Sequence, residues 1–410
     1  MTLYGNGRAA LAGDRETAGR LGWPVRRRSR PDPEIVLRPR DGDPTAEPWI
    51  APPGWHRRLG LAPHPRHGAL ERGWTYLPGV AGLDRHLARL AEPRPRDGLV
   101  VALAGLGRVG GVAATMLAAS PVRTSGIREL RIHDADAPNQ QRWALELGSI
   151  ASWRAREPRP EVRAARVGEL FDGCDAFLFA PAVGVPPLGS EGDVRLVQFE
   201  PNRAILRPYL DAARAAGFTG LFLIVSDPVE GLAQAALHDS NLDARGRFDG
   251  RGLAPERIAG LGLGVMWARA LAEARRGGFA DAVAAHGAAF GPHSAEVLAF
   301  DDVRSPDAER SARLTRAARE CNLRVRELGF LPYVGPGVSS VALALPRLFA
   351  GRETPASVLT GGIYFGMPAR CEWAALPSPR RMAAPVWCAI DELHARMRER
   401  AGALGLRFGN

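Results

Sequence analysis

Three glycines and one aspartate form the clearest chemical motif in the sequence. Residues 105–110 read Gly-Leu-Gly-Arg-Val-Gly and follow a short apolar stretch. Glycines at this spacing allow a tight turn, a close approach of the backbone to a pyrophosphate, and close packing of the next helix. A carboxylate about 20 residues further on can accept hydrogen bonds from both ribose hydroxyls and repels a 2′-phosphate. The pattern predicts an NAD site that prefers NAD to NADP, built from Gly105, Gly107, Gly110 and Asp134.

The segments around this motif have the periodicity that such a site requires. Residues 99–104 are typical of a buried strand, an Ala-rich helix extends to about Ala119, and a second strand over 129–133 ends at Asp134. Strand, glycine turn, helix, strand and acid make up a dinucleotide-binding βαβ unit. Further strands are expected over 174–179 and 221–225, with a loop over 181–193 and a helix over 195–213 between them. The order predicts an α/β fold with a doubly wound, Rossmann-type parallel sheet.

The composition excludes several kinds of chemistry. All 54 basic residues are Arg, so neither a Schiff-base lysine nor a lysine-bearing phosphate loop is present. Residues 1–96 hold 17 Arg against 10 acidic residues, which leaves only +3 of the net charge of +10 for the rest. A nucleic-acid groove is therefore not predicted in the main body. The four cysteines, Cys174, Cys321, Cys371 and Cys388, are too far apart for a zinc site, and no metal is predicted.

The first 96 residues differ from the remainder. They contain 13 of the 34 prolines and 4 of the 9 tryptophans, with little periodicity before residues 83–90. We expect an irregular extension that wraps around the body, because tryptophans seldom occur along a wholly disordered tail. No stretch resembles a signal peptide or a membrane span, so a cytoplasmic protein without membrane contact is expected.

From about residue 97 to the C-terminus, further motifs follow in order: Arg195 seven residues before Asn202, Ser226-Asp227-Pro228-Val229, Met266-Trp267-Ala268-Arg269, Gly291-Pro292-His293-Ser294, and strands over 358–366 with a long final helix. In order and spacing, the sequence resembles a divergent member of the lactate/malate dehydrogenase superfamily with an added N-terminal extension. This resemblance implies three parts, namely the extension over 1–96, a dinucleotide-binding domain over 97–232, and an α+β catalytic domain over 233–410.

The resemblance also implies a role for three side chains. His293 would exchange a proton with the substrate, since imidazole titrates near neutral pH. Arg269 would hold a substrate carboxylate with its planar guanidinium, and Arg195 would polarise the carbonyl once its loop closes. The implied activity is NAD-dependent interconversion of a 2-oxo acid and a 2-hydroxy acid. The small-molecule substrate would be the main partner, and the chain would form a homo-oligomer, either a dimer or a tetramer.

Two departures from the family pattern bear on this mechanism. Met266 stands where the family has the aspartate that pairs with the histidine, and a thioether cannot stabilise imidazolium in the same way. Asp227 stands where the family has asparagine. One hypothesis makes Asp227 a catalytic residue that replaces the lost carboxylate beside His293, whereas the rival is that it repels a substrate carboxylate. Glu296, three residues after His293, is a further candidate partner.

The loop before Arg195 indicates the type of substrate. Residues 183–194 contain no Arg, whereas malate-type members place one there to bind a second carboxylate. Leu188 and two prolines stand in the loop instead, which fits an apolar 2-oxo-acid side chain and makes Leu188 a candidate substrate-binding residue. The sequence predicts a non-dicarboxylate substrate, which indicates specialised metabolism.

Three other functions stay open at this point. An oxidoreductase acting on an imine or amine would suit a cationic substrate, given Met266 and Asp227. The second alternative is a ubiquitin-activating-type adenylating protein, a family that Asp134-Ala135-Asp136 with Asn139 and Arg142 resembles. The third alternative is a non-catalytic nucleotide-binding protein whose extension docks on a partner.

Overall fold

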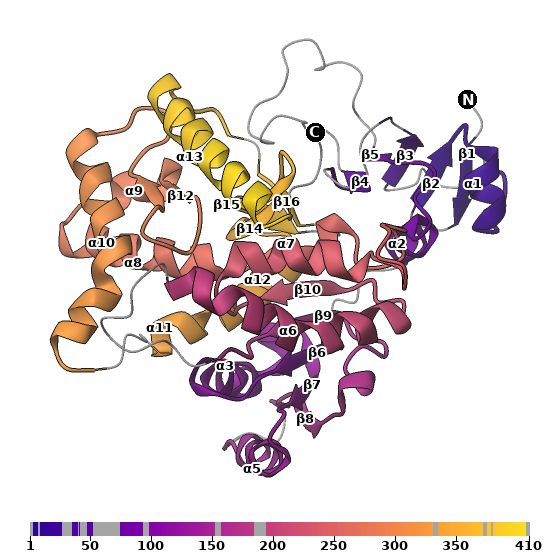
Figure 1. Ribbon diagram of the computed structural model, residues 1–410, viewed down its shortest axis with the longest axis horizontal. Coiled ribbons are helices and arrows are strands. Elements are labelled where there is room, and N and C mark those ends of the chain that lie inside the picture. Colours follow the sequence, from indigo (N-terminus) through magenta and orange to yellow (C-terminus); the bar gives the residue numbers. More distant parts are fainter. Residues whose placement is uncertain are drawn as a thin grey trace.

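The computed structural model describes most of the chain. The described residues are 3–6, 9–26, 35–39, 41, 47–51, 74–92, 98–151, 157–183, 194–330, 335–371, 375–378 and 380–406. They form one large sheet covered by helices, with a smaller sheet from the first part of the chain beside it (Figure 1).

The large sheet has the order β16-β15-β14-β11-β10-β9-β6-β7-β8 in the described residues. The strands are β6 (Leu99–Ala104), β7 (Ile127–His133), β8 (Glu161–Ala164), β9 (Ala176–Phe179), β10 (Leu221–Ile224), β11 (Ile258–Gly260), β14 (Thr354–Thr360), β15 (Ile363–Cys371) and β16 (Ala375–Pro377). Strands β6 to β11 pair in parallel, and β14 to β16 continue the sheet in antiparallel pairs. Because β6 lies between β7 and β9, the chain order reverses at β6, where ligands bind in open α/β sheets.

Helices cover both faces of the parallel strands, as the doubly wound prediction requires. Alternate residues of β6 point to opposite faces, so Val101 and Leu103 join one apolar cluster while Val100 and Ala102 join the other. The first cluster includes α3 (Arg108–Ala119) and α12 (Ala344–Phe349), and the second includes α6 (Val194–Ala215) and α7 (Val229–Ser240). The predicted α/β fold class is therefore confirmed.

The second half of the chain adds helices and a two-stranded sheet beside the antiparallel strands (Figure 1). Its elements include α8 (Gly262–Arg276), α9 (Ala280–His286), β12 (Ala288–Phe290), β13 (Leu298–Phe300), α10 (Ala308–Glu327), α11 (Gly335–Ser339) and α13 (Ala384–Ala403). The predicted boundary at residue 232 falls inside α7, and the division into a cofactor domain and a catalytic domain stays a prediction.

The prediction of an irregular N-terminal extension is wrong for the described residues. They form a five-stranded sheet ordered β1-β2-β3-β5-β4 with two helices. These elements are β1 (Leu3–Asn6), β2 (Ala9–Ala12), α1 (Arg15–Arg20), β3 (Ile35–Pro39), β4 (Ile50–Ala51), β5 (Trp74–Tyr76) and α2 (Leu83–Ala91). Trp23, Trp49 and Tyr76 are buried in a separate apolar cluster. The strands are short and their partners are distant in the sequence, so no local periodicity revealed them.

This N-terminal unit packs on the body through both polar and apolar contacts. Ala254 of the body belongs to its apolar cluster, and the Trp49 amide donates to the Glu256 carboxylate at 3.0 Å. Arg89 of α2 forms an ion pair with Asp175, which precedes β9. The unit is thus joined to the body by buried as well as surface contacts.

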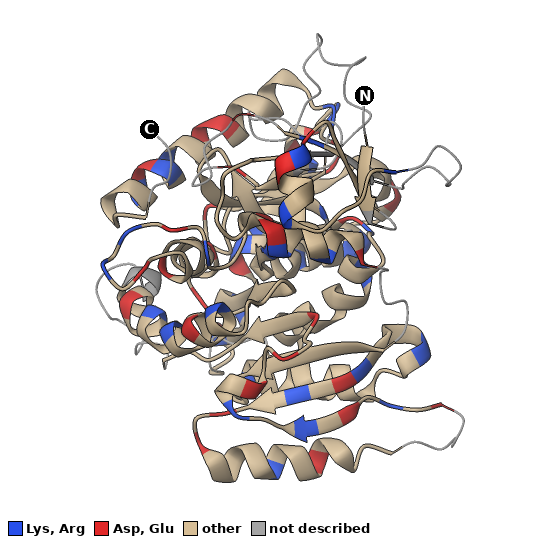
Figure 2. Cartoon of the chain, turned by 90° about the vertical axis from the view of Figure 1, so that its right-hand side faces the viewer, with Lys and Arg blue, Asp and Glu red and all other residues tan. Residues whose placement is uncertain are grey.

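Charge is mixed over the molecule. Figure 2 shows the arginines and the acidic residues interspersed along the same elements in this view. Many are paired, for example Arg203 of α6 with Asp239 of α7 at 2.7 Å, which lowers the pKa of Asp239 to about 2 against the effect of burial. No helix within the described ranges is long and apolar enough to cross a membrane.

Candidate functional site

The carboxyl ends of the parallel strands bring the predicted motifs to one edge of the sheet. The glycine turn follows β6, Asp134 follows β7, residues 180–183 follow β9, and the turn over 226–229 follows β10. The loops after β9 and β10 are bonded directly, because the Ser226 hydroxyl donates to the Pro181 carbonyl at 2.6 Å. This edge is the place where a doubly wound sheet binds its ligand.

Each glycine of the turn has a separate structural reason. Gly105 has a φ of +85°, a region that favours glycine, and a Cβ there would lie 2.4 Å from the Pro181 nitrogen. A Cβ on Gly110 would lie 1.7 Å from the Gly105 carbonyl oxygen, so only glycine lets α3 pack against the turn. A Cβ on Gly107, by contrast, would meet no atom within 4 Å. The exposed backbone at Gly107 therefore leaves open space at the start of α3, where a phosphate group could approach.

Asp134 lies against the same turn. Its Oδ2 accepts a hydrogen bond from the Leu106 amide at 2.6 Å, and its Oδ1 accepts one from the Asp136 amide at 3.0 Å. A carboxylate offers about four lone-pair sites, so these two bonds leave acceptor capacity for hydroxyl groups. The residues present thus fit a dinucleotide, with the adenosine ribose at Asp134 and the pyrophosphate at Gly107.

Arg108 is a further residue that suits an anionic ligand and that the motif analysis did not select. It is exposed at the first position of α3, next to Gly107. The N-terminal amides of a helix and an adjacent guanidinium both favour a phosphate. Its position within the glycine motif was the available signal.

Asn202 and Asp227 connect three segments at this edge. The Asn202 Oδ1 atom accepts from the Val183 amide at 2.8 Å, and its Nδ2 atom donates to the Asp227 carbonyl at 2.6 Å. Asn202 is fully buried, so it holds these loops in place. The Oδ1 atom of Asp227 is buried and has no hydrogen-bond partner in the described part of the chain. A buried acceptor without a partner is costly and indicates a place where a donor could bind.

The His293 side chain lies against the N-terminus of α8, where packing and a hydrogen bond to its ring hold it. A Cβ on Gly262 would lie 2.5 Å from the His293 Cβ, so the His293 side chain can pack this closely only because residue 262 is glycine. The His293 Nδ1 atom lies 2.9 Å from the Gly262 carbonyl oxygen. Because a carbonyl only accepts, Nδ1 carries the proton and Nε2 is left as the nitrogen that can exchange one. No hydrogen bond among the described residues joins the ring to Asp227.

Glu230 is a functional candidate that the sequence analysis missed. Its Oε1 atom accepts from the His293 backbone amide at 3.2 Å and from the Ser357 hydroxyl at 2.7 Å. It thereby joins α7, the His293 loop and β14. Burial raises the pKa of the Glu230 carboxyl, while the Ser357 bond and the nearby imidazole oppose that rise. Its place directly after the turn over 226–229 was the only local signal.

Replacing Glu230 by Gln should change how stability depends on pH. A carboxyl whose pKa is raised by folding stabilises the fold fully below the pKa of the unfolded chain, about 4.5, and loses that contribution as the pH rises toward the folded value. Gln keeps an acceptor for both donors and removes the titration. We expect the wild type to lose stability relative to Glu230→Gln as the pH rises above about 4.5.

Urea unfolding at several pH values checks this expectation. Glu146→Gln is the matched control, because Glu146 is an exposed carboxylate that pairs with Arg142 at the surface. A stability difference between wild type and Glu230→Gln that stays constant from acid to neutral pH would contradict the assignment.

Arg269 and Met266 lie on α8 with the residue that bonds His293. The Arg269 Nη1 atom donates to the Ala318 carbonyl of α10 at 3.2 Å and contacts the Met266 sulfur at 3.5 Å. Arg269 is seven residues after Gly262, so it lies on the same face about 10 Å along the helix axis. Met266 is buried and does not meet the ring through a hydrogen bond. The His293 ring therefore bonds the Gly262 carbonyl and not the Met266 side chain.

The remaining candidates are placed as follows. The backbone of Arg195 lies in the first turn of α6, on the same face as Asn202, while its side chain and Leu188 lie outside the described residues. Glu296 pairs with Arg400 of α13 at 2.8 Å rather than with the imidazole. Arg142 donates to Asn139 on the exposed helix α5 (Ala137–Gly148). Within the described ranges no group of three or more His, Cys, Asp or Glu residues could hold a metal ion.

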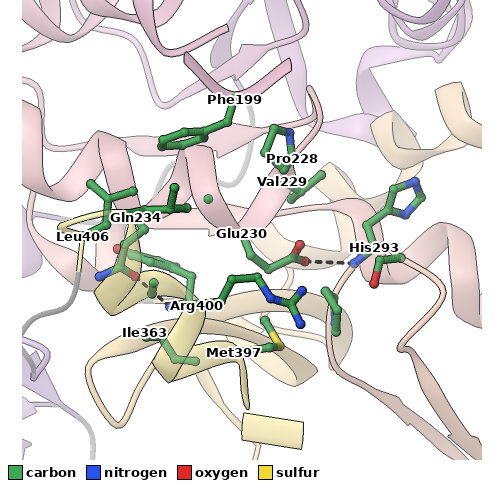
Figure 3. A pocket seen from close by; sticks show the side chains of 16 residues that line it. Phe199, Pro228, Val229, Glu230, Gln234, His293, Ile363, Met397, Arg400 and Leu406 are labelled. Atoms are coloured by element: carbon green, nitrogen blue, oxygen red, sulfur yellow. Dashed lines mark hydrogen bonds between the residues drawn. The ribbon is translucent and has the colours of Figure 1, made fainter. Parts of the chain in front are cut away.

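A cavity of about 110 Å³ lies behind the His293 loop, between α7, β15 and α13. Figure 3 shows the Glu230 carboxylate reaching the His293 amide, the guanidinium of Arg400 below this carboxylate in the view, and the imidazole ring pointing away. Apolar side chains line most of the remaining wall, including Phe199, Ile363 and Met397. Glu230 thus contacts both the His293 loop and the cavity.

Comparison with known proteins supports the fold. The chain is 30% identical over 130 residues to an L-lactate dehydrogenase of Lactobacillus delbrueckii subsp. bulgaricus, which covers 32% of this chain and 38% of that protein. The aligned part of the chain therefore spans well under half of that curated relative. No family model matches the sequence.

Solved structures resemble the chain over a larger part of its length. A lactate dehydrogenase from a Medee basin deep-sea metagenome library has a TM-score of 0.59 and 18% identity, covering 75% of this chain and 98% of its own. A malate dehydrogenase of Archaeoglobus fulgidus, solved with NADH, has a TM-score of 0.60 and 16% identity, covering 75% and 100%. The chain shares the lactate/malate dehydrogenase fold that its motifs predicted.

Proposed function

We propose that this protein is an NAD-dependent oxidoreductase that interconverts a 2-oxo acid and a 2-hydroxy acid without a second carboxylate. The observation that carries the proposal is the His293 ring, whose Nδ1 atom is bonded to the Gly262 carbonyl so that Nε2 is the exchangeable nitrogen. The shared fold and the open glycine turn with Asp134 support the cofactor assignment. Bound NADH would supply the hydride.

The residues of the chain would act in three ways. Imidazolium at His293 would give the Nε2 proton to the oxygen of the substrate during reduction, and the neutral ring would recover it in the reverse direction. The Gly262 carbonyl fixes the tautomer, and Glu230 fixes the loop. Arg269, on the same face of α8, would hold the substrate carboxylate. The proposed roles of Arg195, to polarise the carbonyl, and of Leu188, to contact an apolar side chain, rest on the family resemblance.

A second candidate function is favoured by Asp227. The buried Oδ1 atom of Asp227 has no partner in the described part of the chain, and a carboxylate there accepts hydrogen bonds from a donor such as an iminium or ammonium group. An imine or amine substrate would supply a hydrogen-bond donor to the Oδ1 atom of Asp227. Assaying NADH oxidation with branched-chain 2-oxo acids, with and without added ammonia, decides between the two. NADH oxidation that requires added ammonia would favour the imine or amine oxidoreductase.

NADH should bind more tightly than NADPH. A 2′-phosphate at Asp134 would meet a carboxylate that already lies against the Leu106 amide, and it would lose hydroxyl hydrogen bonds, at a combined cost of about 1–3 kcal/mol. That cost corresponds to about a 5- to 150-fold difference in Kd.

Fluorescence titration of both cofactors measures this ratio. Asp134→Ser should bring the dissociation constants of NADPH and NADH closer together, because it removes the negative charge of Asp134. Asp136→Ser is the control, since Asp136 is exposed and contacts Asp134 through its backbone amide. NADPH binding as tight as NADH to the wild type would exclude the proposed role of Asp134.

We also propose that the protein is a cytoplasmic homo-oligomer. Leu328 and Phe330, which follow α10, are 74% and 69% exposed, and large apolar side chains grouped on a surface favour association. Sedimentation of the wild type should give a mass above that of one 44.0 kDa chain. Replacing both residues by Asp should lower the mass, and an unchanged mass would exclude this surface as the interface.

A further inference from the structure

The cavity behind the His293 loop differs in character from the sheet edge that would bind cofactor. It is lined by α7, β15, α13, the residues just after α13 and the loop from Pro292 to Ser294, and apolar surface comes from Phe199, Ile363, Leu404 and Leu406. Leu406 is almost fully buried although it follows the last helix. A concave apolar wall with few polar groups is typical of a small-molecule site.

One carboxylate oxygen in this cavity has unused acceptor capacity. Both hydrogen bonds to Glu230, from His293 and Ser357, end on Oε1. No hydrogen bond from another described residue ends on Oε2, although the Glu230 backbone amide also donates to the carboxyl, and Glu230 lines the cavity. A buried carboxylate in the wall of an apolar cavity is stabilised by a charged or strongly polar donor.

The other charge on the wall is already compensated. Arg400 donates to Glu296 at 2.8 Å, and this pair holds the pKa of Glu296 below its usual range. Gln234 is also engaged, because it donates to the Gly362 carbonyl and accepts from the Tyr364 amide. Among the described lining residues, Glu230 is therefore the group that selects the charge of a ligand.

We propose that this cavity, which shares the His293 loop with the proposed active site, is a second ligand site that binds a small primary amine with a branched or flat apolar body. The ammonium group would donate to Glu230 Oε2, and the apolar body would lie against Phe199, Ile363 and Met397. Because the same carboxyl holds the His293 amide through Oε1, the bound amine contacts the residue that positions the His293 loop.

Titration calorimetry with three probes of matched shape tests the proposal: isoamylamine, isoamyl alcohol and isovalerate. We expect saturable binding of the amine, with the alcohol at least about ten-fold weaker and the anion weaker still. In Glu230→Gln the amine should lose about ten- to hundred-fold in affinity, as expected for the loss of a charge-assisted hydrogen bond, while the alcohol should change little.

Two further variants locate the site. Met397→Trp should abolish binding of both the amine and the alcohol by filling the cavity, because Met397 lines it. Arg396→Ala is the matched control on the same helix, since Arg396 pairs with Glu296 from the exposed side and should leave binding unchanged. Binding of isoamylamine should also shift the His293 amide resonance in nitrogen-edited NMR spectra.

Several results would overturn the site. They are the absence of saturable amine binding, equal affinity in wild type and Glu230→Gln, and tighter binding of isovalerate than of isoamylamine, which would make Arg400 the selecting group. Far-ultraviolet circular dichroism of each variant checks that the fold is kept. None of these measurements uses cofactor or turnover, so the result is independent of the proposed oxidoreductase activity.

Discussion

Replacing His293 by Gln should lower kcat for reduction of the 2-oxo acid by about 10²- to 10⁴-fold, the usual contribution of a positioned general acid. The structure places the ring nitrogen Nδ1 2.9 Å from the Gly262 carbonyl, which leaves Nε2 for the substrate. A Gln amide can still donate a hydrogen bond but does not give up a proton near neutral pH. Stopped-flow measurement of NADH oxidation under single-turnover conditions reports the effect on the chemical step.

The matched control for this variant is His286→Gln. His286 ends α9 and precedes the strand that leads to the His293 loop, so it tests whether loss of any nearby histidine disturbs the fold. We expect His286→Gln to keep at least about half of the wild-type kcat, since His286 is only half-buried and Gln is a polar side chain of similar size. Full activity in His293→Gln would show that another group carries the proton.

Replacing Arg269 by Ala should lower kcat/KM for a 2-oxo acid by about 10²- to 10⁴-fold, because two charge-assisted hydrogen bonds to the carboxylate are lost at roughly 1.5–3 kcal/mol each. The guanidinium lies between the Ala318 carbonyl and the Met266 sulfur, which orients its plane on α8. Lysine keeps the charge but lacks the fork, so Arg269→Lys should recover less than about a tenth of the lost activity.

Steady-state kinetics with the best 2-oxo acid substrate measures both variants. Arg276→Ala is the control, because Arg276 lies about two turns further along α8 and pairs with Glu273 at the surface. NADH affinity should be the same in all three variants, since the proposed cofactor site is at the glycine turn. Unchanged kcat/KM in Arg269→Ala would show that another cationic residue binds the substrate carboxylate.

Local sequence pattern was sufficient to predict the βαβ unit that contains the glycine turn. Residues 99–104 are apolar throughout and form β6, the glycine turn follows, and Asp134 comes directly after β7 and lies against that turn. The apolar strand pattern, the glycine turn and the position of Asp134 all lie within about 35 residues, so the βαβ unit could be predicted. The predicted helix over 195–213 likewise corresponds to α6.

The N-terminal unit could not be predicted in this way. Strand β2 pairs with β3, and β3 with β5, across long stretches of sequence. Each strand is too short to give a clear alternation, and burial of Trp49 depends on Glu256 and Ala254 of the body. Nonlocal pairing and shared burial therefore produced order where the composition indicated irregular structure.

The surroundings of His293 depended on contacts that no motif contains. Its type and the spacing of its neighbours indicated proton transfer, but the sequence offered Asp227 and Glu296 as partners. In the folded chain the ring meets the Gly262 carbonyl, and its amide meets Glu230, which is bonded to Ser357 127 residues away. Side-chain chemistry is a property of each residue and can be read along the chain. Which carboxylate is buried beside which loop follows from the packing of α7, α8 and β14, and that packing exists only in three dimensions.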